Sequence, residues 1–216
     1  MGSSTLPKLV WLASYPRSGN TLLRTILFQC FGLSSGSVYS KDLGQVGGIQ
    51  TLVGHVEAKS GRMDFGDQAF GLVKTHGSPQ TSDPAIYVLR DGRDAAVSLF
   101  HFLNEAVPIL DIVEGKTRFG TWAQHIATWS PKVRSGTLLV RYEDMTDRLE
   151  DVVQSISAFL EIIPQSRSIP SREEMAKQDG RWIKSSTQRG APIRGAALDR
   201  FMELNGQAMR DWGYLD

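Results

Sequence analysis

The segment SYPRSGNT, residues 14–21, follows a short apolar stretch at 9–13 and precedes a run with helical spacing. At such strand-to-helix junctions, successive backbone N–H groups and the positive end of the helix attract anions. Arg17 adds a fixed positive charge, and Ser18 and Thr21 add hydroxyl groups. The sequence therefore predicts an anion site at this loop. An ordinary turn with an exposed arginine is the alternative interpretation.

The loop differs from the phosphate-binding loop GxxxxGK[ST] of nucleotide hydrolases. In those loops a Lys follows the second Gly, and the next Ser or Thr holds Mg²⁺. Here Asn20 follows Gly19, and the cation is Arg17 instead. A transferring group that carries less negative charge than the γ-phosphoryl group of ATP needs less neutralisation. We therefore expect side-chain cations to suffice, with no metal required.

Five short segments together resemble the sulfotransferase family that uses 3′-phosphoadenosine 5′-phosphosulfate (PAPS), particularly its compact bacterial members. The cytosolic branch of that family carries segments similar to YPKSGTTW, KTH, RNPKDVAVSYYHF, YED and RKG, in this order. This chain reads YPRSGNTL at 15–22, KTH at 74–76, RDGRDAAVSLFHF at 90–102, YED at 142–144 and QRG at 188–190. The resemblance implies transfer of a sulfuryl group from PAPS to a hydroxyl or amine of a small-molecule acceptor.

The resemblance assigns the first loop to the 5′-phosphosulfate of PAPS, through Arg17, Ser18, Gly19, Asn20 and Thr21. Arg17 stands where the family usually has Lys, so the charge is kept but a planar fork replaces a compact ammonium. Leu22 stands where the cytosolic branch has a Trp that packs near the adenine. The adenine contact must therefore be made differently in this chain.

In the same resemblance His76 is the base that deprotonates the acceptor, and Lys74 binds the sulfuryl oxygens. Imidazole is suited to this role because it titrates near neutral pH. We expect an in-line displacement in which Arg17 and Lys74 stabilise charge, without a covalent enzyme intermediate. Without the resemblance, His76 would be interpreted as a surface or capping residue, and Lys74 as a solvated residue at a strand end.

Arg90 and Ser98 match the family's pair for the 3′-phosphate, because they have the same eight-residue separation. Charge-assisted bonds from an Arg and a directional hydroxyl can recognise such a phosphate. Tyr142 is predicted to pack near the adenine or, alternatively, to cover the core. Arg189 and Gly190 resemble the terminal RKG segment, although a Gln precedes them where the family has an Arg.

The elements that would position these residues alternate along the chain. Apolar stretches of strand length predict buried strands at 9–13, 70–74, 85–89 and 138–141. Helical spacing predicts helices at 22–31, 94–103, 149–160 and 196–212, with Gly32 ending the first and Asp94 capping the second. Residues 34–71, rich in Gly and Ser, are expected to form loop with short helical pieces. This order predicts a single α/β domain over 1–216, with a mostly parallel sheet flanked by helices and a P-loop-like start.

The amino-acid composition limits the classes of partner and site that the sequence supports. Lys and Arg total 24 against 23 for Asp and Glu in 216 residues, so no overall charge favours nucleic acid or anionic membrane. The single Cys30 excludes an internal disulfide and a Cys-rich zinc site. We see neither a signal peptide nor an apolar run of the roughly 20 residues that span a bilayer. We therefore expect a cytoplasmic protein, and a homodimer is compatible with the sequence.

Two other functions compete with this interpretation. A small nucleotide-dependent kinase would share the strand-loop-helix start, but it would require Mg²⁺ and a Lys after Gly19. A nucleotide-binding module that has lost catalysis is the second alternative. The presence of Arg17, Lys74 and His76 together argues against the second.

Overall fold

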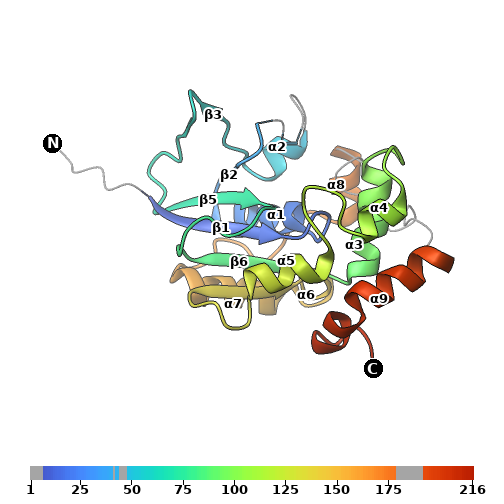
Figure 1. Ribbon diagram of the computed structural model, residues 1–216. Helices are drawn as coiled ribbons and strands as arrows, with labels where there is room; N and C mark the ends of the chain where they lie inside the picture. Colours follow the sequence, from blue (N-terminus) through green and yellow to red (C-terminus); the bar gives the residue numbers. More distant parts are fainter. Residues whose placement is uncertain (1–6, 41, 44–47, 179–191) are drawn as a thin grey trace.

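The computed structural model describes residues 7–40, 42–43, 48–178 and 192–216 (Figure 1). Its main sheet is parallel throughout, in the strand order β2-β5-β1-β6-β7. The strands of this sheet are β1 (Lys8–Ser14), β2 (Ser35–Ser37), β5 (Phe70–Thr75), β6 (Ala85–Leu89) and β7 (Thr137–Arg141). A small antiparallel hairpin is formed by β3 (Ala58–Lys59) and β4 (Arg62–Met63). The predicted α/β fold with a parallel sheet flanked by helices is confirmed.

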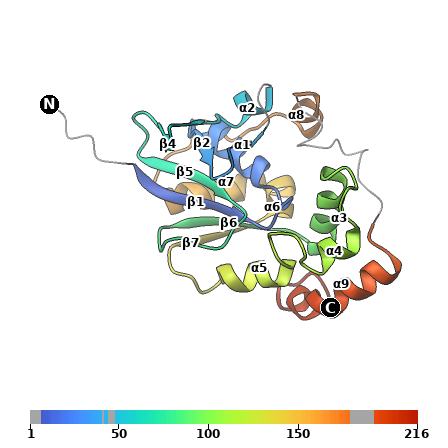
Figure 2. The ribbon, with the colours of Figure 1, turned by 45° about the horizontal axis from the view of Figure 1, so that its top comes forward.

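The helices of the described residues are α1 (Asn20–Phe31), α2 (Gly48–Leu52), α3 (Gly92–Phe102), α4 (Ile109–Val113), α5 (Trp122–Trp129), α6 (Tyr142–Asp147), α7 (Leu149–Leu160), α8 (Arg172–Gln178) and α9 (Gly195–Asp211). None of these helices is long and apolar enough to cross a membrane. The longer helices form two layers, one on each face of the sheet (Figure 2).

Alternating side chains of β1 build the two halves of the core. Val10 and Leu12 face the layer that contains α1 and α7, and Trp11 and Ala13 face the layer that contains α5 and α9. All four are buried, which explains why the middle of β1 is apolar on both faces, as expected of a central parallel strand. Leu12 is fully buried, and truncation of such a side chain to Ala costs about 2–5 kcal/mol.

The start of α3 differs from the prediction. Asp91, rather than Asp94, caps the helix, and its carboxylate accepts the backbone N–H of Arg93 at 2.8 Å. A capping side chain must stand immediately before the first turn, whereas Asp94 lies inside that turn. The guanidinium of Arg93 also pairs with the Asp91 carboxylate at 2.6 Å. The cap therefore also fixes a basic side chain at the carboxyl end of β6.

The segment predicted as loop, 34–71, contains the edge strand β2. On its inner side β2 pairs with β5. On its outer side the Ser35 N–H donates to the carbonyl of Gly54 at 3.0 Å, and the Val56 N–H donates to the carbonyl of Ser35 at 3.0 Å. At Gly36, a Cβ would lie 2.3 Å from the sulfur of Met63 in β4, so a larger residue here would have to displace the Met63 side chain. The hairpin therefore lies directly against β2.

Candidate active site

A large cleft of about 2290 Å³ opens where β1, β5 and β6 end. The carboxyl ends of parallel strands meet at one edge of a sheet, so residues that follow different strands converge there. The predicted site residues that line the cleft are Arg17, Gly19, Asn20, Thr21, Leu22, Lys74, His76, Arg90, Ser98 and Tyr142. Ser18 is buried in the same loop but is not part of the lining, and Arg189 and Gly190 lie outside the described residues.

The loop after β1 is shaped by Gly19, which has a φ of +106°. A Cβ at this position would lie 2.5 Å from Cδ2 of Tyr142, so both backbone conformation and space require glycine. Helix α1 begins at the next residue, Asn20. The first backbone N–H groups of a helix have no acceptor within it and carry partial positive charge. This end of α1 borders the cleft through Asn20, Thr21 and Leu22.

Three buried polar atoms around this loop have no hydrogen-bond partner within the described residues. They are Oγ of Ser18, Oδ1 of Asn20 and Nε of Arg90. Buried polar atoms are nearly always paired in folded proteins, so unpaired ones indicate a ligand position or a strained site. The Ser18 hydroxyl and the Arg90 guanidinium are donors, which suits the anionic oxygens of a phosphate or sulfate. The residues therefore fit an anionic ligand such as PAPS.

The side chains predicted to hold the two ends of PAPS contact one another. Nε of Arg17 donates to Oγ of Ser98 at 3.2 Å, and the Arg90 guanidinium donates to the backbone carbonyl of Arg17 at 3.0 Å. The Arg17 guanidinium also lies 4.6 Å from the centre of the Phe102 ring, and Arg90 lies 4.4 Å from that of Tyr142. The structure thus brings the residues predicted for the 5′-phosphosulfate into contact with those predicted for the 3′-phosphate, and together they form a basic surface.

His76 follows β5 and is held by both its ring and its backbone. Its Nδ1 lies 2.8 Å from the backbone carbonyl of Ser14, so this nitrogen carries the proton and Nε2 carries the lone pair. The backbone N–H of His76 donates to the hydroxyl of Tyr39 at 2.9 Å. Burial, assisted by the nearby charge of Lys74, lowers the pKa of His76 well below 6.5. The imidazole is therefore neutral at pH 7, which is the form that a base requires.

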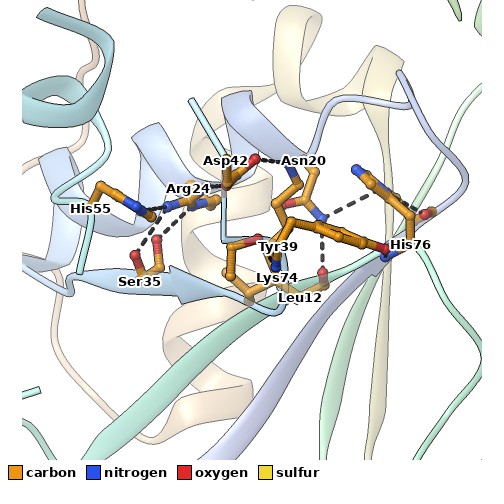
Figure 3. A network of polar contacts seen from close by, with 11 residues as sticks. Leu12, Asn20, Arg24, Ser35, Tyr39, Asp42, His55, Lys74 and His76 are labelled. Atoms are coloured by element: carbon orange, nitrogen blue, oxygen red, sulfur yellow. Dashed lines mark hydrogen bonds and ion pairs between the residues drawn. The ribbon is translucent and has the colours of Figure 1, made fainter. Parts of the chain in front are cut away.

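Lys74 belongs to a buried polar network that the sequence did not predict (Figure 3). One carboxylate oxygen of Asp42 pairs with Nζ of Lys74 at 2.5 Å, and the other pairs with the Arg24 guanidinium at 2.6 Å. Arg24, fully buried in α1, also donates to Oγ of Ser35 at 2.7 Å and to its carbonyl at 3.0 Å. The same guanidinium lies 2.8 Å from Nδ1 of His55, which therefore acts as an acceptor.

Burial and charge act in opposite directions within this network. Burial lowers the pKa of Lys74 to about 8, although the Asp42 carboxylate partly opposes the change. Burial alone would raise the pKa of Asp42, but the charges of Lys74 and Arg24 hold it below its ordinary value. Asp42 is thus an anion between two cations, and Lys74 is a cation whose proton is easily lost.

Aromatic side chains surround the imidazole on its open side. The ring of Tyr39 is stacked on His76 with 5.8 Å between centroids, and the ring of Phe119 meets it edge-on at 6.0 Å. The Arg118 guanidinium lies 4.9 Å from the centre of the Tyr39 ring and 4.8 Å from that of Phe119. All four residues line the cleft. Sequence analysis missed Tyr39, Arg118 and Phe119, because they lie in irregular segments without a motif.

Among residues 7–40, 42–43, 48–178 and 192–216, no group of three or more His, Cys, Asp or Glu side chains is placed to hold a metal ion.

Comparisons with known proteins agree with this fold. A crystal structure of retinol dehydratase in a complex with retinol and PAP has a TM-score of 0.55 at 18% identity, covering 94% of this chain and 80% of that one. A mouse sulfotransferase complexed with PAP has a TM-score of 0.52 at 19% identity, covering 94% and 81%. At these identities the likeness establishes the fold alone.

Curated relatives are similar over a comparable range. Mouse Sulfotransferase 1E1 is 22% identical over 183 residues, which are 73% of this chain and 60% of that protein. A WSCD family member from Aedes aegypti is 30% identical over 177 residues, which are 73% of this chain and 52% of that protein. The chain thus spans between about half and three fifths of the length of these relatives. Residues 7–198 match the family model described as the sulfotransferase domain. The chain therefore belongs to the sulfotransferase domain family.

Proposed function

We propose that this protein transfers a sulfuryl group from PAPS to a hydroxyl or amine of a small-molecule acceptor. The observation that carries the proposal is the meeting, at one sheet edge, of a neutral imidazole at His76 with the cations of Arg17, Lys74 and Arg90. Family membership supports the same reaction. Two similar solved structures are described as complexes with PAP, the product that PAPS would leave.

The donor would bind along the basic surface described above. The loop of Arg17, Ser18 and Gly19, with the start of α1, would hold the 5′-phosphosulfate. Arg90 and Ser98 would hold the 3′-phosphate, and Tyr142, which lies against both Gly19 and Arg90, would pack near the adenine. The contact between Arg17 and Ser98 supports a role for Arg17 at both ends of the donor. The predicted contribution of Arg189 and Gly190 remains part of the proposal.

In the proposed reaction the acceptor hydroxyl oxygen attacks the sulfur in line with the leaving oxygen. Nε2 of His76 takes the hydroxyl proton as the new S–O bond forms and the bond to the 5′-phosphate breaks. The negative charge that develops on the sulfuryl and bridging oxygens is stabilised by Lys74 and Arg17. No covalent enzyme intermediate is needed, and positioning supplies much of the acceleration. The carbonyl of Ser14 holds the imidazole in the required tautomer.

The contacts of Asn20 argue against a kinase. Asn20 occupies the place of the catalytic Lys of nucleotide hydrolases, and its amide nitrogen donates to the backbone carbonyl of Leu12 at 2.8 Å. It therefore supplies neither a charge nor a free donor to a γ-phosphate. A sulfotransferase that needs no metal should keep its activity in excess chelator, whereas a kinase should lose it.

The central test is the variant His76→Ala. We expect kcat to fall by about 10²- to 10⁴-fold, because general-base catalysis contributes this much. Binding of PAP, measured by calorimetry, should remain near the wild-type value, because the base faces the acceptor. His101→Ala is the matched control, since His101 also lines the cleft but pairs with Glu105 at 3.3 Å.

Two results would contradict the proposal at different points. Wild-type turnover in the His76→Ala variant would eliminate His76 as the base. Equal affinity of the wild-type protein for PAP and for AMP would eliminate PAPS as the donor, because Arg90 and Ser98 would then recognise no 3′-phosphate.

A further inference from the structure

A cation, Arg118, lines the same cleft as the proposed base His76. Arg118 lies in the turn between α4 and α5, and its guanidinium contacts the rings of Tyr39 and Phe119 at 4.9 and 4.8 Å. The same two rings contact the imidazole of His76. The guanidinium and the imidazole are therefore bridged by the same two aromatic side chains.

Among the residues that the structure describes, no Asp or Glu forms an ion pair with Arg118 that would neutralise its charge. Two carboxylates of the cleft lining are already engaged, since Asp42 lies between Lys74 and Arg24, and Glu105 lies beside His101. The cleft thus presents a positive charge that an anion could approach.

The turn that carries Arg118 is held in place by a tight backbone conformation and by ion pairs. Gly115 has a φ of +71°, and a Cβ there would lie 2.6 Å from the backbone nitrogen of Thr121, so the turn closes tightly on itself. Lys116 pairs with Glu114 at 2.8 Å, and Glu114 pairs in turn with Arg200 of α9 at 3.0 Å. These contacts anchor the turn to the body of the protein. The fold thus holds the backbone of Arg118 in place beside the cleft.

We propose that Arg118 binds an anionic group of the acceptor. The acceptor would then be a compound that carries a carboxylate or a phosphate in addition to the hydroxyl that is sulfated. A guanidinium suits this task because it can bind either anion through two parallel hydrogen bonds. The rings of Tyr39 and Phe119 help to keep it in place, since aromatic faces attract cations. This inference rests on the proposed function.

Matched phenols that differ only in charge provide the test. The probes are 4-hydroxyphenylacetate, its methyl ester, 4-hydroxybenzylphosphonate and tyramine. We expect wild-type kcat/KM to be about tenfold higher for the anions than for the neutral ester, as a partly exposed ion pair allows. Tyramine, a cation, should be the poorest substrate. Whichever anion has the larger kcat/KM relative to the ester carries the group, carboxylate or phosphonate, that Arg118 binds better.

Arg118→Gln should bring the anions and the ester to equal kcat/KM, while turnover of the ester stays near that of the wild type. Arg118→Lys should keep part of the preference, because the charge is retained. Arg62→Gln, at an exposed arginine of β4 outside the cleft lining, is the matched control and should change nothing. An undiminished anion preference in Arg118→Gln, or equal rates for all probes with the wild type, would overturn the inference.

A binding measurement separates this inference from the proposed function. Calorimetry of 4-hydroxyphenylacetate with the PAP-bound protein should give affinity about tenfold weaker in Arg118→Gln than in the wild type. If this difference is found but no phenol is turned over with PAPS, the anion site stands and the proposed reaction fails. If phenols are turned over and the difference is missing, the proposed reaction stands and the anion site fails.

Discussion

Two carboxylates in this molecule each lie between two cations, but one is buried and the other is partly exposed. Asp42 lies between Lys74 and Arg24, and its side chain is 2% exposed. Glu114 lies between Lys116 and Arg200, and its side chain is 26% exposed. The Asp42 group holds the Lys74 cation in the cleft. The Glu114 group connects the turn that carries Arg118 to helix α9. The same arrangement of charges thus serves two purposes.

The difference in burial determines what each group does. A buried charge must be paired, because desolvation costs several kcal/mol for each unpaired ion. An exposed group of charges is screened by water and contributes little to stability. The two lysines respond in opposite ways, because burial lowers the pKa of Lys74, whereas hydrogen bonds to Glu114 and Asp111 raise the pKa of Lys116. Burial therefore turns a structural ion pair into a group that can titrate near physiological pH.

The largest expected effect comes from Asp42→Asn. This change leaves Arg24 and Lys74 buried beside one another without their shared anion, so we expect the free energy of unfolding to fall by about 3–5 kcal/mol. Urea denaturation monitored by circular dichroism measures the loss. Asp67→Asn, at an exposed position, is the control and should be nearly neutral. A loss as small as that of the control would mean that burial does not distinguish the two groups.

The titration of the two lysines gives the next effect. The ammonium of Lys74 should lose its proton with a midpoint near pH 8, and that of Lys116 only above its ordinary pKa of 10.5. NMR of the lysine side chains measures both midpoints. If protonated Lys74 stabilises charge during transfer, kcat/KM should fall about tenfold for each pH unit above 8. The low pKa of His76 keeps the base neutral over this range.

The variant Lys74→Arg sharpens this experiment. An Arg keeps its charge to far higher pH, so the decline above pH 8 should disappear even if the overall rate is lower. An unchanged decline in this variant would assign it to another group. If Lys74 and Lys116 titrated at the same pH in the wild-type protein, burial would not distinguish the two lysines.

The smallest effect is expected from Glu114→Gln. The midpoint of thermal unfolding should shift by less than about 2 °C, because an exposed ion pair contributes little. Differential scanning calorimetry at low and high salt measures this shift. A decrease similar to that of Asp42→Asn would show that the exposed group is an essential part of the fold.

Much of the fold could be predicted because its central strands and long helices carry their own patterns. Strand β6 and helix α7 have the predicted bounds, since an apolar run and a helical repeat are visible in their residues alone. Strand β2 could not be predicted, because Ser-Gly-Ser has neither apolar residues nor alternation. It forms because β5 and residues 54–56 satisfy its backbone groups from both sides.

The site could be predicted only where its residues lie in local motifs. The loop around Arg17 follows β1 and His76 follows β5, so their common position at one edge of the sheet was predictable. Arg24 has its partner Asp42 eighteen residues further along, and Asp42 meets Lys74 across thirty-two residues. No pattern within a single element marks such pairs. An arginine next to the apolar residues of α1 was the only signal in the sequence.

The covered outer edge of β2 restricts how two copies of this chain can associate. A sheet grows by adding a strand to backbone groups that are still available at its edge. At β2, the N–H and carbonyl of Ser35 are already bonded to Gly54 and Val56. A continuous sheet across a dimer at this edge would require prior displacement of residues 54–56. A dimer that preserves this cover would have to use other surfaces.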